Sequence, residues 1–372
     1  MWEEVAATET NYVLMNKDTP VLEFLCRRNE YDEPEFYEGR WHTAYKPIGY
    51  RGLIAFLEHR KAPKHRRHIQ QLLEQYGCND LEGFLQVTHA LSLNDTFWVQ
   101  RSDGCSLRWK DVSLYSNPFS EVISQAAFDG TISEMDLSST SPEFGTDGYY
   151  AKCWVRDAGG VQLYKSGSAL YEIEPLSEFL AAQLALELCA ASVPYDLGYH
   201  HGKLVSRCPL FTSETVGLAK AGAVFGGAEH TIPELLAYFA SIGSEDAFRR
   251  MCVLDAVILN PDRHYGNFGV LFDTSTMEVL GMAPVFDHNK SLLPELDDDQ
   301  ILEPEWYIDH CRPRLGKDFL LTARRLLTDP IRADLERLRA FAFQQHPEIR
   351  AGQARLDALS EIVQRRIQLI LM

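Results

Sequence analysis

The N-terminal part of the chain alternates short apolar runs with polar turns, a pattern typical of small antiparallel sheets. Apolar residues concentrate at positions 12–15 and 21–25, and Lys17 and Asp18 lie between the two runs. Because a short polar turn between two strand-like runs favours reversal of the chain, this segment predicts a β-hairpin.

A change in composition divides the chain near residue 130. Before it, Asn79 and Asp80 precede an apolar segment that continues to Thr88, which predicts a capped helix. Residues 129–148 are rich in Gly, Ser, Thr, Asp and Pro, as expected of a segment between domains. We therefore interpret residues 1–130 as an N-terminal accessory domain.

Strand patterns and one helix follow this boundary. Strand-like runs at 149–155 and 161–165 flank a turn rich in glycine, and a helix is predicted from Pro175 to about residue 190. With a further short strand at 204–205, these elements predict a β-rich lobe over residues 131–210.

The next segment combines four elements in a recognisable order. A helical period gives way to a polar loop, then to a hairpin, and finally to an apolar run that ends in an aspartate. These elements cover residues 247–259, 260–267, 268–282 and 283–287. This order is the layout of the helical lobe of a protein-kinase-like fold.

Helical spacing continues to the C-terminus. Two apolar sets predict core-facing stripes: Leu335, Leu338, Phe341 and Ala342, and then Leu356, Leu359, Ile362 and Val363. Residues 211–372 are therefore predicted to form a helical lobe, and the expected fold class is α+β, bilobal, with the accessory domain in front.

The polar loop and the aspartate after the hairpin carry the main candidate chemistry. Asp262 and Asn267 have the Asp-x-x-x-x-Asn spacing of a kinase catalytic loop, in which the aspartate accepts a hydroxyl proton and the asparagine carbonyl binds Mg²⁺. Asp287 would supply a second, charged metal ligand. Mg²⁺ prefers such oxygen ligands together with phosphates. The alternative is an ordinary Asp/Asn-rich loop, but the flanking elements favour catalysis.

A kinase also needs a fixed positive charge near the nucleotide phosphates. Lys165 ends a predicted strand and Glu178 lies early in the next helix, which is the order of a lysine held by a helix carboxylate. Thr146 and Gly148 lie in a glycine-containing loop whose backbone N–H groups could meet phosphate oxygens. The alternatives are an exposed lysine, a helix-start acid and a plain turn.

Composition narrows the classes of partner. The 372 residues are 45% hydrophobic, so a sizeable core is expected, and the net charge of −17 disfavours nonspecific binding to nucleic acid or an anionic membrane. Eight scattered cysteines without a Cys-x-x-Cys pair disfavour zinc and dithiol sites. Together with the acidic N-terminus, these features predict a cytoplasmic protein.

Several of these segments resemble the HipA-like kinases, bacterial serine/threonine kinases with a bilobal fold that include toxins of toxin–antitoxin pairs. The resemblance covers roughly residues 140–300. It rests on residues 147–152 (Asp-Gly-Tyr-Tyr-Ala-Lys), 164–165 (Tyr-Lys), 177–179 (Ser-Glu-Phe), 260–267 (Asn-Pro-Asp-Arg-His-Tyr-Gly-Asn) and 283–287 (Ala-Pro-Val-Phe-Asp).

The resemblance implies a role for each matched residue. It implies Asp262 as catalytic base, with His264 supporting its loop, and Asn267 and Asp287 as Mg²⁺ ligands. It implies that ATP binds Lys165. Further candidates for ATP binding are Lys152, Gly148, Thr146 and Glu178, together with a hinge that includes Cys208 and Leu210.

Three functions remain open at this point. The first is an ATP/Mg²⁺-dependent kinase acting on a protein serine or threonine, with an antitoxin-like or regulatory partner possible. The second is a small-molecule or lipid kinase, because Asp-Arg-His-x-x-Asn also resembles the loop of phosphoinositide kinases. The third is a pseudokinase or interaction module that binds nucleotide without chemistry.

Overall fold

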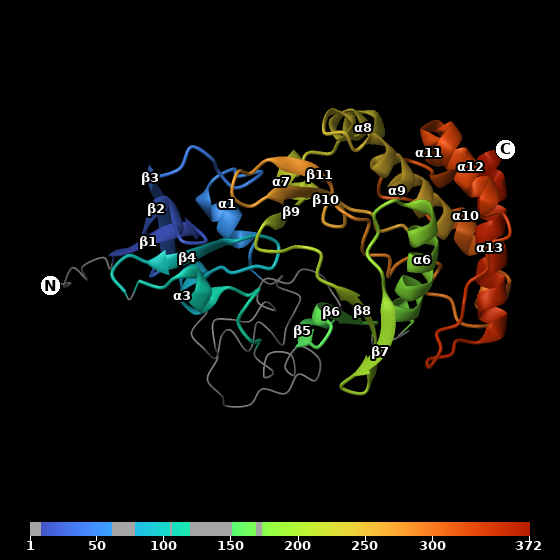
Figure 1. Cartoon of the computed structure of the whole chain (residues 1–372), viewed down its shortest axis with the longest axis horizontal. Helices are drawn as coiled ribbons and strands as arrows, with labels where there is room; N and C mark the ends of the chain where they lie inside the picture. The colour runs from blue at the N-terminus through green and yellow to red at the C-terminus, as the bar shows by residue number, and fades with distance from the viewer. Residues whose placement is uncertain (1–8, 62–78, 105, 120–150, 169–172) are drawn as a thin grey trace. The chain divides into compact units, whose positions relative to one another are not determined.

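The computed structural model describes residues 9–61, 79–104, 106–119, 151–168 and 173–372 (Figure 1). Contacts between residues divide the chain into two compact units. The first unit comprises Met1–Leu163, Thr212–Ala219 and Phe272–Glu278, and the second comprises Tyr164–Phe211, Lys220–Leu271 and Val279–Met372. The predicted boundary near residue 130 lies outside the described residues, and the boundary at 210 stays a prediction.

A four-stranded sheet with the order β3-β2-β1-β4 is the centre of the first unit. Its strands are β1 (Glu9–Asn16), β2 (Thr19–Arg28), β3 (Pro34–Trp41) and β4 (Phe97–Arg101), and neighbouring strands are antiparallel. The predicted hairpin is confirmed, because Asn16 pairs with Thr19 across a two-residue turn. Lys17 in that turn has a φ of 51°, the positive value that tight hairpins favour.

Short helices accompany this sheet: α1 (Leu53–Glu58), α3 (Leu81–Thr88) and α4 (Trp109–Val112). The predicted cap is confirmed at Asp80, whose side chain accepts a hydrogen bond from the Gly83 N–H. Trp98, Phe84 and Tyr12 are almost fully buried, so the first unit has an aromatic core of its own.

Two further sheets have the strand orders β5-β6-β8-β7 and β11-β10-β9. Their strands are β5 (Lys152–Asp157), β6 (Gly160–Ser166), β7 (Asp196–His200), β8 (Lys203–Pro209), β9 (Val216–Lys220), β10 (Gly269–Asp273) and β11 (Val279–Met282). The predicted strands at 161–165 and 204–205 and the hairpin over 268–282 are confirmed. β7, which pairs antiparallel with β8, is not evident in the sequence pattern.

Helices dominate the second unit: α6 (Glu174–Leu188), α7 (Ala221–Phe225), α8 (Ile232–Ser241), α9 (Glu245–Ile258), α10 (Glu305–His310), α11 (Phe319–Leu326), α12 (Asp329–Arg337) and α13 (Gln353–Leu371), with a 3₁₀ turn at Gln300–Leu302. The predicted helix after residue 175 is confirmed as α6. Helices α6, α8, α11 and α13 pack against α9 (Figure 1). Every residue from Met251 to Ile258 is buried, so the loop after α9 begins on a rigid base.

One predicted stripe is confirmed and the other is partly wrong. Leu356, Leu359, Ile362 and Val363 of α13 are all buried. Leu335 and Leu338 are also buried, but α12 ends at Arg337 and Ala342 is exposed. The chain leaves the helix there because Phe343 packs inward and donates its N–H to the Ser360 Oγ, 3.1 Å away.

Antiparallel sheets together with a cluster of helices confirm the predicted α+β class. None of the helices that the structure describes is both long enough and apolar enough to cross a membrane.

Candidate active site

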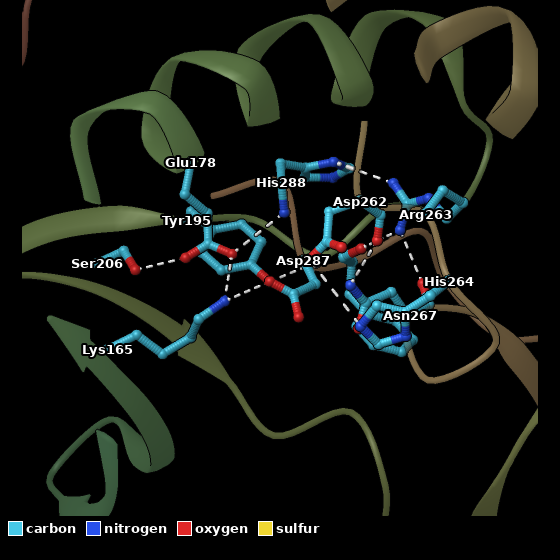
Figure 2. Close-up of polar contacts among 11 residues, drawn as sticks. Lys165, Glu178, Tyr195, Ser206, Asp262, Arg263, His264, Asn267, Asp287 and His288 are labelled. Atoms are coloured by element: carbon cyan, nitrogen blue, oxygen red, sulfur yellow. Dashed lines mark hydrogen bonds and ion pairs between the residues drawn. The ribbon is translucent and has the colours of Figure 1, made fainter. Parts of the chain in front are cut away.

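Lys165, at the end of β6, lies between two carboxylates. Its Nζ donates hydrogen bonds to Glu178 Oε1 at 2.6 Å and to Asp287 Oδ1 at 2.7 Å (Figure 2). The lysine is 6% exposed. Burial alone would lower the pKa of the ammonium, but the charges of Asp287 and Glu178 raise it above its ordinary value. The predicted Lys165–Glu178 ion pair is therefore present, and Lys165 is a fixed cation.

Glu178 is held in place by donors from three directions. It lies in the second turn of α6 and is fully buried. Its Oε2 accepts a hydrogen bond from Ser206 Oγ at 2.5 Å, and its Oε1 also accepts one from the His288 N–H at 3.3 Å. A buried carboxylate is tolerated only when it is paired and hydrogen-bonded, and Glu178 satisfies both conditions. It therefore links α6, β8 and the Asp287 loop.

Asp287 has an unusual backbone conformation. Its φ is +61°, in the left-handed region that non-glycine residues seldom adopt. Its N–H donates to the Tyr195 OH at 3.1 Å, and the Tyr195 ring lies 5.8 Å from Lys165 Nζ. Left-handed backbone at an aspartate persists only where neighbouring contacts impose it. These contacts direct the Asp287 carboxylate toward Lys165.

The loop that contains Asp262 begins where α9 ends. Leu259 caps α9 in the left-handed conformation with φ 52°. Asn260 follows, with its Nδ2 donating to Asp255 Oδ1 at 3.0 Å and its Oδ1 accepting from the Asp262 N–H at 3.1 Å. The direction of the chain at Asp262 is therefore set by a buried side chain of α9.

Arg263 ties this loop to the Asp287 segment. Its side chain is 1% exposed, and its Nε and Nη2 donate to the two carboxylate oxygens of Asp255 at 3.0 and 2.9 Å. Its Nη1 donates to the carbonyl oxygens of Asn267 at 2.7 Å and Phe286 at 2.5 Å. Because only a planar fork can make these contacts together, Arg263 fixes both loops at once (Figure 2).

Asn267 and Asp262 close the catalytic-loop candidate. Asn267 Nδ2 donates to the Asp262 carbonyl at 3.0 Å, which leaves the amide oxygen of Asn267 as the atom suited to a cation. The Asp262 carboxylate itself is about one-third exposed, so a substrate can reach it. The structure thus brings together Asp262, Asn267 and Asp287 around Arg263, and Asp287 with Lys165 and Glu178.

His264 contacts other residues of its own loop. Its Nδ1 accepts from the Gly266 N–H at 2.9 Å, and its Nε2 lies 4.0 Å from Asp262 Oδ2. A Cβ at position 266 would lie 2.7 Å from the imidazole, so a larger residue there would displace the His264 ring. Burial lowers the pKa of His264, and the cations Arg314 and Lys220 lower it further, against the opposite effect of Asp262 and Asp287. His264 is therefore neutral at pH 7, and its imidazole stabilises the loop through the hydrogen bond from Gly266.

Sequence reasoning missed several residues that shape this site. Arg314 is the most exposed of them: its Nε lies 3.4 Å from Asp262 Oδ1, on the oxygen that His264 does not face. Ser206 and Tyr195 hold Glu178 and Asp287, and Asp255 holds Arg263. The one local signal in the sequence was Asp255, which lies among apolar residues of α9. A buried charge needs a partner, so this position could have indicated a paired cation such as Arg263.

The remaining predicted nucleotide contacts stay predictions. Thr146 and Gly148 lie outside the described residues. Lys152 belongs to β5 in the first unit, and Leu210 follows β8. Cys208 is buried in β8, and burial raises the pKa of its thiol to about 12, so a thiolate at this position is excluded at neutral pH.

Comparison with known proteins reveals similarity at the level of the fold. No family model matches the sequence, and no curated protein matches it. HipA of Shewanella oneidensis MR-1, solved as a toxin–antitoxin complex with HipB and operator DNA, superposes with a TM-score of 0.56 over 96% of this chain and 96% of HipA, at 11% identity. CtkA, a proinflammatory kinase of Helicobacter pylori, gives 0.44 over 59% of this chain and 92% of its own, at 18% identity. The likeness to HipA shows that this chain has the HipA-like fold predicted from its sequence.

Proposed function

We propose that this chain is an ATP/Mg²⁺-dependent kinase that phosphorylates a serine or threonine of a protein. The observation that carries the proposal is Lys165, whose Nζ lies 2.6 Å from Glu178 and 2.7 Å from Asp287. A strand lysine that contacts both a helix glutamate and a loop aspartate forms the set that kinases use to bind nucleotide phosphates and their metal.

The residues present fit a magnesium ion. Asp287 offers a carboxylate and Asn267 offers an amide oxygen, both from the loops that Arg263 holds. Mg²⁺ is usually bound by one or two carboxylates with phosphates and water completing its octahedron. Among the described residues no group of three His, Cys, Asp or Glu side chains is arranged to hold a metal, so such an ion would take most ligands from ATP and water. When bound, the ion would neutralise charge on the phosphates.

Three residues of the protein have separate roles in the proposed reaction. Lys165 binds the nucleotide phosphates, and Glu178 keeps the lysine in position. Asp262 accepts the proton of the acceptor hydroxyl while the hydroxyl oxygen forms a bond to the terminal phosphorus, and the bond to the bridging oxygen of ADP breaks. The partly exposed carboxylate of Asp262 suits that role, since a protein side chain must reach it.

The fold also supports this proposal. HipA matches over 96% of both chains, and the HipA-like kinases are the family that the catalytic and metal loops resemble. HipA was solved with the partner protein HipB, and we extend to this chain the proposal of a regulatory protein partner. Pull-down of the tagged protein from its native cells, compared with the Asp262→Asn variant, tests for such a partner.

One experiment separates the three functions left open by the sequence. The purified protein is incubated with ATP labelled at the terminal phosphate, Mg²⁺ and a lysate of its native cells. Label on protein that disappears with Asp262→Asn supports the protein kinase, and label on small molecules alone favours a small-molecule or lipid kinase. ATP binding without any transfer would favour a pseudokinase and contradict the proposal.

A further inference from the structure

A short basic segment lies directly beside Asp262. It comprises residues 311–317, Cys-Arg-Pro-Arg-Leu-Gly-Lys, between α10 and α11, and we name it the basic strip. It contains three cations and no acid, whereas residues 295–309 contain several acids and no lysine or arginine. In a chain of net charge −17, a cationic strip at this position is a local exception.

The strip has an inner and an outer side. Cys311, Pro313 and Leu315 are partly buried, whereas the residues between them, Arg312 and Arg314, are exposed. On the inner side, Cys311 Sγ lies 3.9 Å from the Leu259 carbonyl oxygen. Pro313 and Leu315 line a cavity of about 10 Å³ together with Asp255, Asn260 and Arg263. The inner side therefore rests on the buried base of the Asp262 loop.

The conformation of the strip is also constrained at its end. Gly316 has a φ of +82°, and a Cβ there would lie 2.6 Å from Thr322 Oγ1 of α11. Glycine is therefore required for the chain to turn into the helix. Because Cys311, Pro313 and Leu315 are partly buried, Arg312 and Arg314 are left on the exposed side, and this surface is largely preformed.

The charges on the outer side are available to a ligand. Arg314 is 61% exposed and has one ion pair, to Asp262 Oδ1 at 3.4 Å. Within the part of the chain that the structure describes, Arg312 and Lys317 have no ion-pair partner. Solvated cations attract anions without a large desolvation cost, and arginine binds carboxylates and phosphates with two parallel hydrogen bonds.

We propose that the basic strip docks an acidic segment of the acceptor protein, next to the serine or threonine that receives the phosphoryl group. This inference rests on the proposed kinase function and names the class of its substrate. Without acceptor, Arg314 pairs with Asp262. When the acceptor binds, its carboxylate pairs with Arg314 and its hydroxyl donates a hydrogen bond to Asp262, so the ion pair between Arg314 and Asp262 is broken. Nucleic acid is the less suitable ligand. A long polyanion would extend past the three cations of the strip, and the net charge of −17 on the chain would repel it.

A peptide library tests this proposal directly. Each peptide carries a central serine or threonine, and one flanking position at a time is fixed as aspartate, alanine or lysine. Transfer of label from ATP is measured for the wild type, for Arg314→Glu and for Arg312→Glu. Arg350→Glu is the matched control, because it makes the same charge change at an exposed residue outside the strip.

We expect the wild type to label aspartate peptides about threefold to tenfold faster than alanine peptides at one or two positions, as exposed ion pairs allow. The preference should weaken in 0.5 M salt, which screens exposed charges at roughly this strength. Arg314→Glu should label lysine peptides faster than aspartate peptides at the same position. Arg350→Glu should keep the wild-type preference for aspartate. Reversal of a preference is an outcome that a purely structural role of Arg314 would not give.

The outcomes against the proposal are distinct from failure of the kinase assignment. Equal labelling of aspartate, alanine and lysine peptides by the wild type would overturn the docking proposal and leave the kinase standing. The same conclusion follows if Arg314→Glu retains the aspartate preference. No label on any peptide would count against a protein acceptor and remove the docking proposal with it.

A binding measurement covers the case in which Arg314→Glu transfers no label. Fluorescence anisotropy of a labelled serine peptide flanked by aspartates is compared between the wild type and the Arg312→Glu/Lys317→Glu variant, which leaves Asp262 and its contact intact. The proposal expects the Kd to rise about threefold to tenfold in the variant. An unchanged Kd would overturn it.

Discussion

Lys165 Nζ lies 2.7 Å from Asp287 Oδ1, so the candidate phosphate-binding cation and the candidate metal ligand are in direct contact. Each group has a further hydrogen bond that fixes its position: Lys165 Nζ donates to Glu178, and the Asp287 N–H donates to the Tyr195 hydroxyl. If the proposed function holds, Mg²⁺–ATP must exchange this ion pair for two new ones, a phosphate on Lys165 and a cation on Asp287. The pair thus keeps both side chains ordered before the nucleotide binds.

Replacement of Asp287 should separate metal-dependent from metal-independent binding of ATP. With Mg²⁺ present, Asp287→Asn should weaken ATP binding by about tenfold or more and Asn267→Ala by about threefold, because a carboxylate offers full charge and an amide only a dipole. Without Mg²⁺, Asp287→Asn should bind ATP at least as well as the wild type, since Lys165 loses a competing partner. Calorimetry under both conditions measures this. Equal losses for both variants would contradict the ranking, and no loss for either would place the metal elsewhere.

Lys165 and Glu178 should act as one unit. Lys165→Met should weaken ATP binding directly, and Glu178→Gln should act by releasing Lys165, so its effect should largely vanish in the Lys165→Met background. Lys165→Met should also destabilise the fold by about 3–5 kcal/mol, because it leaves a fully buried Glu178 carboxylate without its cation. Adding Glu178→Gln should recover part of that loss.

Calorimetric titrations and urea denaturation of the two single variants and the double variant complete the cycle. Binding losses that add in the double variant would mean that the two residues act independently. Lys152 would then become the preferred phosphate-binding lysine.

Much of the site could be predicted because its chemistry is encoded in short segments. Asp262 and Asn267 are five positions apart, and Lys165 and Glu178 end and begin consecutive elements, so local spacing alone pairs them. The residues that hold them come from distant parts of the chain. Ser206 lies on β8, and Arg314 lies in an irregular segment that no periodicity describes. Contacts of this kind depend on tertiary packing, which a single sequence does not display.

The fold follows the same division. The hairpins β1–β2 and β10–β11 each have apolar runs on both sides of clear turn residues, so the sequence pattern is sufficient to predict both hairpins. β7 is a five-residue strand, Asp-Leu-Gly-Tyr-His, in which glycine and two polar residues weaken the strand pattern. Its place is determined by pairing with β8 instead. The end of α12 was missed for a similar reason, since burial of Phe343 against α13 overrides a helical period.

Arg263 should be irreplaceable even by lysine. Arg263→Lys keeps the positive charge but cannot donate to both Asp255 oxygens and to the carbonyls of Asn267 and Phe286. We expect a loss of about 2–4 kcal/mol in the free energy of unfolding, because buried acceptors lose their donors. Urea denaturation measures this loss.

A matched control lies on the same helix as Asp255. Arg249→Lys alters an arginine whose partner Glu245 is about half exposed and whose Nη1 also donates to the Leu326 carbonyl oxygen at 3.3 Å. Because a lysine can keep the pair with Glu245, this variant should change stability by less than about 1 kcal/mol. If the two variants were equally stable, the fork of Arg263 would not be what joins the two loops.

Asp262→Asn should separate chemistry from binding. The substitution preserves the shape of the side chain and removes its capacity to accept the acceptor proton, so the rate of transfer should fall by about a hundredfold to ten-thousandfold. ATP affinity should stay nearly unchanged, because the residues around Lys165 do not include Asp262, and stability should change little because its contacts to Arg314 and His264 are partly exposed. Single-turnover transfer measured beside ATP calorimetry provides both numbers. A rate within about threefold of the wild type, under conditions where chemistry limits turnover, would remove Asp262 from the role of catalytic base.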